Sequence, residues 1–323
     1  MCLKGLLALA LRVSTPAPKD PHYDLKFNGT SGEGGQAKVF ITAEELEQMM
    51  ASEKGVTILD ARNKINPLAL LLNPGAGWTI PGAYRAHWLD FIAPGTRDTL
   101  LPVPELEKMF RDRGVSNDVP VVVYGSWTEA WGEEGRIYWQ LDWLGHKQTY
   151  ILYGGLFAWK TRRQQGRGRS GMGDFVAHPV ANRTIDANQI MTKMDSEPST
   201  LLLLDVRTTA EYEGAKLYGA KRGGHVPSAV HYGWKRVFTD DGSGNLKNPS
   251  ELHEEISKMG RTDGVKIAAY CTGGIRSGFM YAVLKWLGYK DIANYAGSWW
   301  DWASREDLPI STAAPAALPV TKL

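Results

Sequence analysis

Cysteine is scarce in this sequence of 323 residues, which contains only Cys2 and Cys271. A single pair cannot build a disulfide framework, and Cys2 lies next to the N-terminus, where chains are seldom held in place, so we expect no disulfide. Two cysteines also exclude metal sites made of several thiolates, and the seven histidines lack the spacing of an HExxH motif. The sequence therefore predicts no metal site.

Net charge and long apolar runs are lacking as well. A formal charge of +2 gives no general reason to expect a nucleic acid or a membrane surface as partner. The apolar stretch Gly5–Leu11 is too short to span a bilayer. Because Lys4 precedes it, the stretch fits either a weak export signal or a disordered leader. The compartment, cytoplasm or periplasm, therefore stays open.

One order of predicted strands and helices occurs twice in the chain. Each copy has a helix start, a buried strand ending in Asp-x-Arg, a further helix, a second apolar strand, a helix ending in Trp-Leu-Gly and a last strand. Corresponding residues lie about 145 positions apart, as in a duplicated domain: Asp60 and Asp205, Tyr124 and Tyr270, Gly145 and Gly288. Strands that alternate with capped helices predict the α/β class, with a mainly parallel sheet flanked by helices in each copy.

These patterns divide the chain into five parts. We expect a leader over residues 1–38, a first domain over 39–160, a basic glycine-rich linker over 161–183, a second domain over 184–310 and a flexible tail over 311–323. Each domain is expected to begin with a capped helix, in which Thr42 is followed by Glu45 and Asp186 by Gln189. The linker is interpreted as a solvated connection between the two domains.

The candidate chemistry lies directly after the apolar strand Val265–Tyr270 of the second copy. There Cys271 opens a turn that comes before the helical pattern of residues 279–288. The residues of this turn are Thr272, Gly273, Gly274, Ile275, Arg276 and Ser277. A cysteine in such a turn faces backbone N–H groups, the positive end of a helix dipole and a nearby arginine, and each favours the thiolate over the thiol. The turn also suits an anion, so we interpret Cys271 as a nucleophile rather than a buried structural cysteine.

The first copy lacks this chemistry. It has Gly125 where the second copy has Cys271, and its longer loop carries Glu129, Glu133 and Glu134. A cluster of carboxylates would repel both an anionic substrate and a thiolate. We therefore expect the first domain to be non-catalytic and to supply one wall of a cleft at the domain interface.

Four charged or polar residues upstream of Cys271 are also interpreted. Arg222 is a candidate for binding an anionic substrate, because a guanidinium presents a fork to a sulfonate or carboxylate. Arg207 and Glu211, four residues apart after a strand, are expected to form a structural ion pair. His225 is interpreted as a hydrogen-bonded loop histidine rather than a general base.

Four motifs together resemble the tandem-domain rhodanese family, which includes the thiosulfate and 3-mercaptopyruvate sulfurtransferases. They are Leu204–Arg207 with Glu211-Tyr212, Gly224–Pro227, Cys271–Arg276 and Tyr295–Trp299. The resemblance implies an active C-terminal domain in which Cys271 takes a sulfane sulfur from a small anionic donor as a persulfide. It also implies a thiol, cyanide or protein acceptor, no cofactor, backbone amides of residues 272–277 around the persulfide, and Arg222 as the substrate-binding cation.

The sequence departs from the family pattern at the turn itself. Thiosulfate enzymes often carry a basic pair after the cysteine and mercaptopyruvate enzymes carry Gly-Ser, whereas this chain has Thr272-Gly273, so the donor stays open. Two alternatives also stay open: a persulfide carrier that serves a partner protein, and a cysteine-dependent phosphatase. Phosphatases place their arginine six residues after the cysteine, and Arg276 is five residues after Cys271, which favours sulfur transfer.

Overall fold

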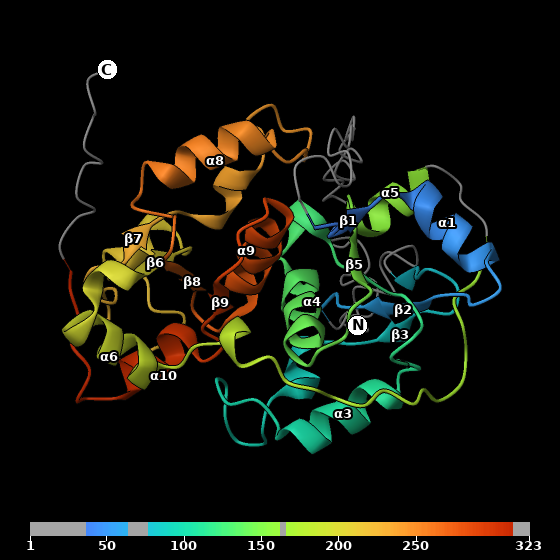
Figure 1. The fold of residues 1–323 in the computed structure, drawn as a ribbon, viewed down its shortest axis with the longest axis horizontal. Coiled ribbons are helices and arrows are strands. Elements are labelled where there is room, and N and C mark those ends of the chain that lie inside the picture. The colour runs from blue at the N-terminus through green and yellow to red at the C-terminus, as the bar shows by residue number, and fades with distance from the viewer. Residues whose placement is uncertain (1–36, 64–76, 162–165, 313–323) are drawn as a thin grey trace, which may run out of the picture.

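Two α/β units make up the computed structural model, which describes residues 37–63, 77–161 and 166–312 (Figure 1). Nearly all of the expected leader, with Cys2 and Gly5–Leu11, lies outside the described residues, as do residues 162–165 of the expected linker and 313–323 of the expected tail. Within the described part of the chain, no helix combines the length and apolar character that a membrane span requires.

The first unit is built on a sheet of five strands whose neighbours all run parallel. The strands, in spatial order, are β1 (Phe40–Ile41), β5 (Thr149–Leu152), β4 (Val121–Tyr124), β2 (Thr57–Asp60) and β3 (Tyr84–Arg85). Its helices are α1 (Ala43–Ala51), α3 (Val103–Arg111), α4 (Glu133–Trp143) and α5 (Gly155–Thr161). Side chains of α1 and α5 pack on one face of the sheet and those of α3 and α4 on the other, because successive strand residues point to opposite faces.

The second unit repeats this plan with four parallel strands. In spatial order they are β7 (Val230–His231), β6 (Leu201–Asp205), β8 (Lys266–Tyr270) and β9 (Ile292–Asn294). Its helices are α6 (Ala187–Ser196), α7 (Thr209–Tyr212), α8 (Pro249–Ser257), α9 (Ile275–Trp286) and α10 (Ser298–Ser304). Helices α6 and α10 cover one face, and α8 and α9 cover the other. The predicted α/β class, with two mainly parallel sheets flanked by helices, is confirmed.

Local signals in the sequence set the first helix of each unit. Thr42 accepts a hydrogen bond from the backbone N–H of Glu45, whose carboxylate accepts one from the N–H of Thr42. Asp186 and Gln189 form the same reciprocal pair before α6. Both expected caps are confirmed. Short 3-10 segments connect other elements: Trp88–Phe91, Trp127–Glu129, Ala181–Arg183, Pro198–Thr200 and Trp234–Val237.

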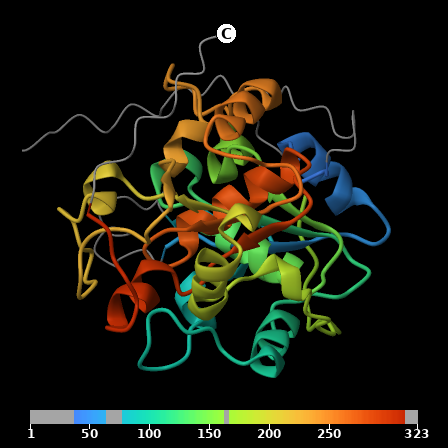
Figure 2. The same ribbon diagram turned by 60° about the vertical axis from the view of Figure 1, so that its left-hand side comes forward.

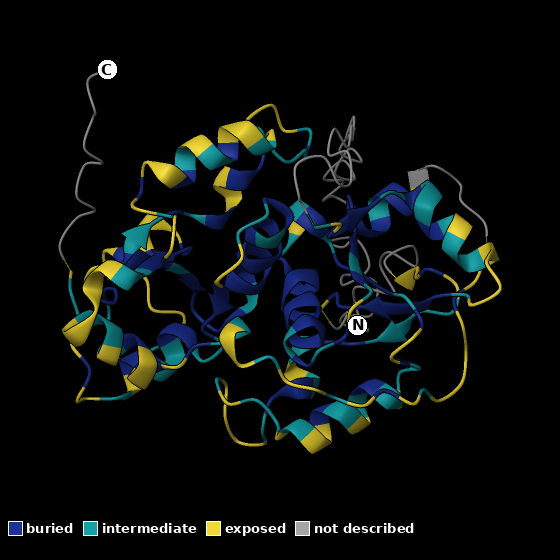
Figure 3. Ribbon diagram, viewed as in Figure 1, coloured by how far each residue is buried: buried dark blue, intermediate teal, exposed yellow. Residues whose placement is uncertain are grey.

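Helices α4 and α9 pack against each other at the centre of the molecule and join the two units (Figures 1 and 2). The contact is close and reciprocal, because a Cβ on Gly135 would lie under 3.0 Å from Cα of Phe279, and a Cβ on Gly278 would lie 2.8 Å from Cα of Arg136. Both helices are almost wholly buried (Figure 3). Side chains on the first unit's α4 are therefore held in contact with the second unit and away from solvent.

Candidate functional site

Cys271 lies at the carboxyl end of β8, between β6 and β9. Ligands of parallel sheets bind at this edge. Helix α9 begins at Ile275, earlier than the expected helical pattern, because Gly274 serves as its N-cap with φ +78°. In that conformation the N–H of Gly274 donates to Sγ of Cys271 over 3.1 Å. Ser298 of α10 accepts, through its Oγ, a 3.1 Å hydrogen bond from the N–H of Cys271. The loop therefore holds the sulfur at a helix N-terminus.

The surroundings of Cys271 favour its ionised form. Only 1% of the residue is exposed, and burial by itself raises the pKa of the thiol. The charge of Arg276 and the backbone N–H groups of Ser277 and Gly273 outweigh burial and lower the pKa below its ordinary value. The thiolate is the nucleophilic form of cysteine. This direction agrees with the effect expected of Arg276 and the loop amides.

Arg276 is itself held by a buried carboxylate. Its two terminal nitrogens donate to the oxygens of Glu211 at 2.8 and 2.7 Å, and Thr272 donates to the same carboxylate at 2.5 Å. Burial raises the pKa of Glu211, but its hydrogen bonds to Arg276 and Thr272 and the charge of Arg276 lower it to about 2. The triad clamps the cysteine loop to α7, with both charges almost fully buried.

The expected ion pair between Arg207 and Glu211 is wrong. Arg207 pairs instead with Asp205 at 2.6 Å, and its guanidinium also donates to the carbonyl of Gly224. The spacing of the sequence did not predict this pairing, because the side chain of Arg207 turns back to Asp205 at the end of β6. The carboxylate of Glu211 pairs instead with Arg276 of α9. In the first unit, Arg62 pairs with Asp60 in the same way.

Arg222 does not line the site of Cys271. Its guanidinium donates at 3.1 Å to each of three backbone carbonyls, and a fourth carbonyl also accepts from it. These carbonyls belong to Ala303, Leu308, Trp302 and Arg305. Every bond goes to the end of α10 and the chain that follows, so the geometry assigns Arg222 to holding that segment rather than to a substrate. His225 stacks on Tyr212 and bonds its carbonyl at 2.9 Å, which agrees with a loop histidine.

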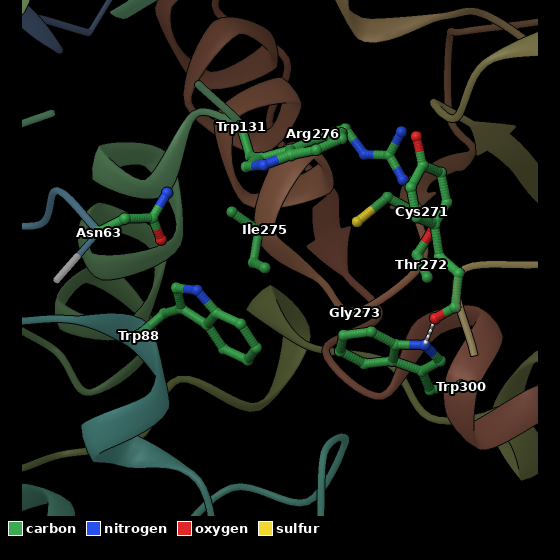
Figure 4. A pocket seen from close by; sticks show the side chains of 10 residues that line it. Asn63, Trp88, Trp131, Cys271, Thr272, Gly273, Ile275, Arg276 and Trp300 are labelled. Atoms are coloured by element: carbon green, nitrogen blue, oxygen red, sulfur yellow. Dashed lines mark hydrogen bonds between the residues drawn. The ribbon is translucent and has the colours of Figure 1, made fainter. Parts of the chain in front are cut away.

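A pocket of about 180 Å³ opens onto Cys271 between the two units (Figure 4). The sulfur points toward the space between Trp131 on one side and Trp88 and Trp300 on the other. Lining residues are Asn63, Trp88, Trp131, Tyr218, Cys271, Thr272, Gly273, Ile275, Arg276 and Trp300. The first three come from the first unit, so the expected wall is present. Of the turn residues, Gly274 and Ser277 are absent from this lining.

Four of the ten lining residues are aromatic, and both units contribute to them. Trp88 stacks on Trp300 with 6.2 Å between ring centroids, and Trp131 meets Tyr218 edge-on at 5.9 Å. A Cβ on Gly273 would lie under 3.0 Å from the ring of Trp300, so only glycine lets that ring cover the loop. Trp88 and Tyr218 carry no local signal in the sequence, because only the fold brings them to Cys271.

The matching position of the first unit is filled by a side chain. A Cβ on Gly125 would lie under 3.0 Å from the carboxylate of Glu134, which is fully buried. Burial and the neighbouring charge of Glu133 raise the pKa of Glu134 well above its ordinary value. The side chain of Glu134 therefore fills the space beside Gly125 in the first unit. This steric filling matters more than the charge repulsion expected from three carboxylates. No three His, Cys, Asp or Glu side chains among the described residues gather to hold a metal.

Comparison with known proteins places both units in one family. The model of the rhodanese-like domain matches residues 42–162 and again residues 186–305. A thiosulfate sulfurtransferase of Pseudomonas aeruginosa is 32% identical over 251 residues, and the match covers 73% of this chain and 84% of that protein. A protein of Thermus thermophilus named sulfur carrier protein TtuD is 29% identical over 253 residues, and the match covers 72% of this chain and 85% of that protein.

Two solved structures share the fold. EanB in complex with ergothioneine has a TM-score of 0.73 at 18% identity and covers 87% of this chain and 71% of its own. SseA from Escherichia coli, solved to describe the rhodanese fold and mechanism of 3-mercaptopyruvate sulfotransferases, has a TM-score of 0.66 at 21% identity and covers 81% of this chain and 99% of its own. At these identities the likeness concerns the fold alone.

Proposed function

The chain belongs to the rhodanese-like family and is a sulfurtransferase of the rhodanese type, and from this premise we propose that Cys271 carries sulfur as a persulfide. The observation that carries the proposal is the 3.1 Å hydrogen bond from the N–H of Gly274 to Sγ of Cys271, a residue that lines the pocket. A donor placed there meets a thiolate held by backbone amides, and the same amides stabilise negative charge on a second sulfur.

The first half-reaction loads the cysteine. The thiolate of Cys271 attacks the transferable sulfur of a small anionic donor, which is the outer sulfur of thiosulfate or the thiol sulfur of 3-mercaptopyruvate, and forms a sulfur–sulfur bond. With thiosulfate the original sulfur–sulfur bond breaks, and sulfite leaves with its electron pair. With 3-mercaptopyruvate the carbon–sulfur bond breaks, and the carbanion takes a proton to become pyruvate. In both cases the terminal sulfur is left as an anion facing the loop amides.

The second half-reaction passes the sulfur on. A thiol, cyanide or a protein acceptor attacks the terminal sulfur of the persulfide, the bond to Sγ breaks, and the electron pair returns to Cys271 as thiolate. The N–H of Gly274 donates to Sγ in the free enzyme and is placed to receive it again as leaving group. The proposal includes domain limits at 39–160 and 184–310, a non-catalytic first domain, and residues 272–277 as the substrate cradle.

A phosphatase is disfavoured by the state of Arg276. Both oxygens of Glu211 bind this guanidinium, so its fork is not presented to a phosphate. A persulfide carrier for a partner protein is the second candidate, and the relative named a sulfur carrier protein favours it. The two sulfur-based candidates share loading of Cys271 and differ in how fast the sulfur leaves in the absence of a partner.

The test is to incubate the protein with thiosulfate or 3-mercaptopyruvate and to determine its mass under non-reducing conditions. We expect each intact chain to gain the mass of one sulfur atom, to lose it on addition of cyanide, and to gain nothing in Cys271→Ser. Sulfur transfer at full rate by Cys271→Ser would overturn the proposal. The ratio of kcat/KM for the two donors then identifies the preferred one, and loading without turnover would favour the carrier.

A further inference from the structure

Arg136 of α4 reaches from the first unit to the cysteine loop of the second. Its Nη1 donates to the carbonyl of Gly274 at 3.2 Å and to that of Ala296 at 3.3 Å. The approach is so close that a Cβ on Gly274 would lie under 3.0 Å from the same nitrogen. Thus the residue whose N–H binds the sulfur of Cys271 has its carbonyl held by the opposite domain.

Within the described parts of the chain, no carboxylate pairs with the buried positive charge of Arg136. The residue is 0% exposed, and neither Nε nor Nη2 has a hydrogen-bond partner among the described residues. Burial lowers its pKa to about 10, whereas the charge of Cys271 raises it, so the guanidinium stays charged at neutral pH. A buried charge without a counter-charge is costly, and the thiolate of Cys271 is the anion that acts on it.

Reciprocal packing of α4 and α9 explains why this arginine points to the active loop. Gly135 contacts Phe279 and Gly278 contacts Arg136, so Arg136 and Phe279 are counterparts at the crossing. Phe279 of the second unit packs on Trp127 of the first unit at 5.5 Å between centroids, beside the position that lacks a cysteine. The unit with the cysteine receives a cation from its neighbour, whereas the unit without one receives an apolar ring.

We propose that Arg136 is a positioning residue that the first domain supplies to the second: it fixes the Gly274 carbonyl and adds a buried positive charge that stabilises negative sulfur on Cys271. The inference rests on the proposed function, since the persulfide retains the negative charge that Arg136 balances. The first domain, which has Gly125 where the second has Cys271, thereby supports the reaction.

Other charged groups face Cys271 and must be kept constant in a test. Arg276 lies on α9 with Glu211 of α7 bound to it, and on the α10 side the neighbours Ser298 and Trp300 are uncharged. Replacing Arg136 leaves this set intact. Lys285 offers a matched control, because it also contributes a cation to the α4–α9 interface, where it pairs with Asp142.

The experiment measures the rate of alkylation of Cys271 by iodoacetamide against pH, with Cys2→Ser as background so that one thiol reacts. We expect Arg136→Met to move the midpoint upward by about one pH unit, a tenfold loss of thiolate below the midpoint. Arg136→Lys, which keeps the charge but loses the fork, should move it upward by less. Lys285→Met should leave it in place.

A midpoint of Arg136→Met equal to that of Lys285→Met would overturn the inference. If Arg136→Met does not fold, Arg136→Lys decides, because an upward shift supports the inference and a midpoint equal to that of the control refutes it. Alkylation needs no sulfur donor, so the inference can fail while donors still load sulfur on Cys271. Conversely, activity retained by Cys271→Ser would remove the proposed function and leave the alkylation result standing.

Discussion

Gly274 has a left-handed backbone conformation, contacts Arg136 of the other domain and donates a hydrogen bond to Sγ of Cys271. Its replacement by alanine tests all three features. The residue has φ +78°, which L-residues other than glycine rarely adopt. A Cβ there would lie under 3.0 Å from both Nη1 of Arg136 and the carbonyl oxygen of Ala296. Because a carbonyl of the backbone cannot rotate away as a side chain can, the loop itself must move.

The expected cost can be divided with a matched glycine. Gly95 has φ +79° and nothing within 4 Å of its Cβ position, so Gly95→Ala bears the left-handed strain alone, about 1–2 kcal/mol. Gly274→Ala bears the same strain and in addition the overpacking of a buried contact, about 1–3 kcal/mol more. The two variants together isolate the part of the cost that comes from the domain contact.

Urea unfolding of both variants measures this difference, and iodoacetamide alkylation of Cys271 reports on the loop. We expect Gly274→Ala to be the less stable of the two and to react more slowly near neutral pH, because movement of Gly274 removes the N–H from Sγ. Gly95→Ala should keep the alkylation profile of the parent. Equal stability of the two variants, or an unchanged profile in Gly274→Ala, would refute the reasoning.

Three further results are expected. Glu211→Gln should lower the free energy of unfolding by about 3–5 kcal/mol, because it leaves the buried cation of Arg276 unpaired. The pKa of Glu211 is lowered from an ordinary 4.5 to about 2 in the folded protein, so the stability that this carboxylate contributes is complete above about pH 4.5 and is lost as the pH falls toward 2. Unfolding measured against pH in the parent and the variant will show this difference. Arg222→Ala should lower the melting temperature, because it removes hydrogen bonds to backbone carbonyls, and should leave KM for thiosulfate unchanged. A raised KM with an unchanged melting temperature would instead show that Arg222 binds the substrate. Gly125→Ala should destabilise the first unit, and Glu134→Ala in the same chain should restore part of the loss in a double-mutant cycle, whereas strict additivity of the two changes would contradict the contact.

Much of the fold was predictable because its signals are local. Apolar runs, the capping boxes at Thr42 and Asp186 and glycines after helices are each contained in a few residues, and their return about 145 positions later revealed the duplication. The candidate nucleophile was predictable for the same reason, since strand, Cys271, glycine turn and helix follow one another without interruption. The spacing of four residues wrongly predicted an ion pair between Arg207 and Glu211. Their actual ion-pair partners depend on the direction in which the chain turns after the strand.

The sequence by itself determined that the chain has two α/β copies and that one of them offers a cysteine to an anion-binding turn. The tertiary structure alone decided what surrounds that turn: Trp88 stacks on Trp300 in the pocket wall, Arg136 reaches the loop from the opposite domain, and Arg222 is bound to backbone carbonyls outside the pocket. The physical reason is that charges and rings act over a few ångströms in space, whereas these residues are separated by many tens of positions along the chain.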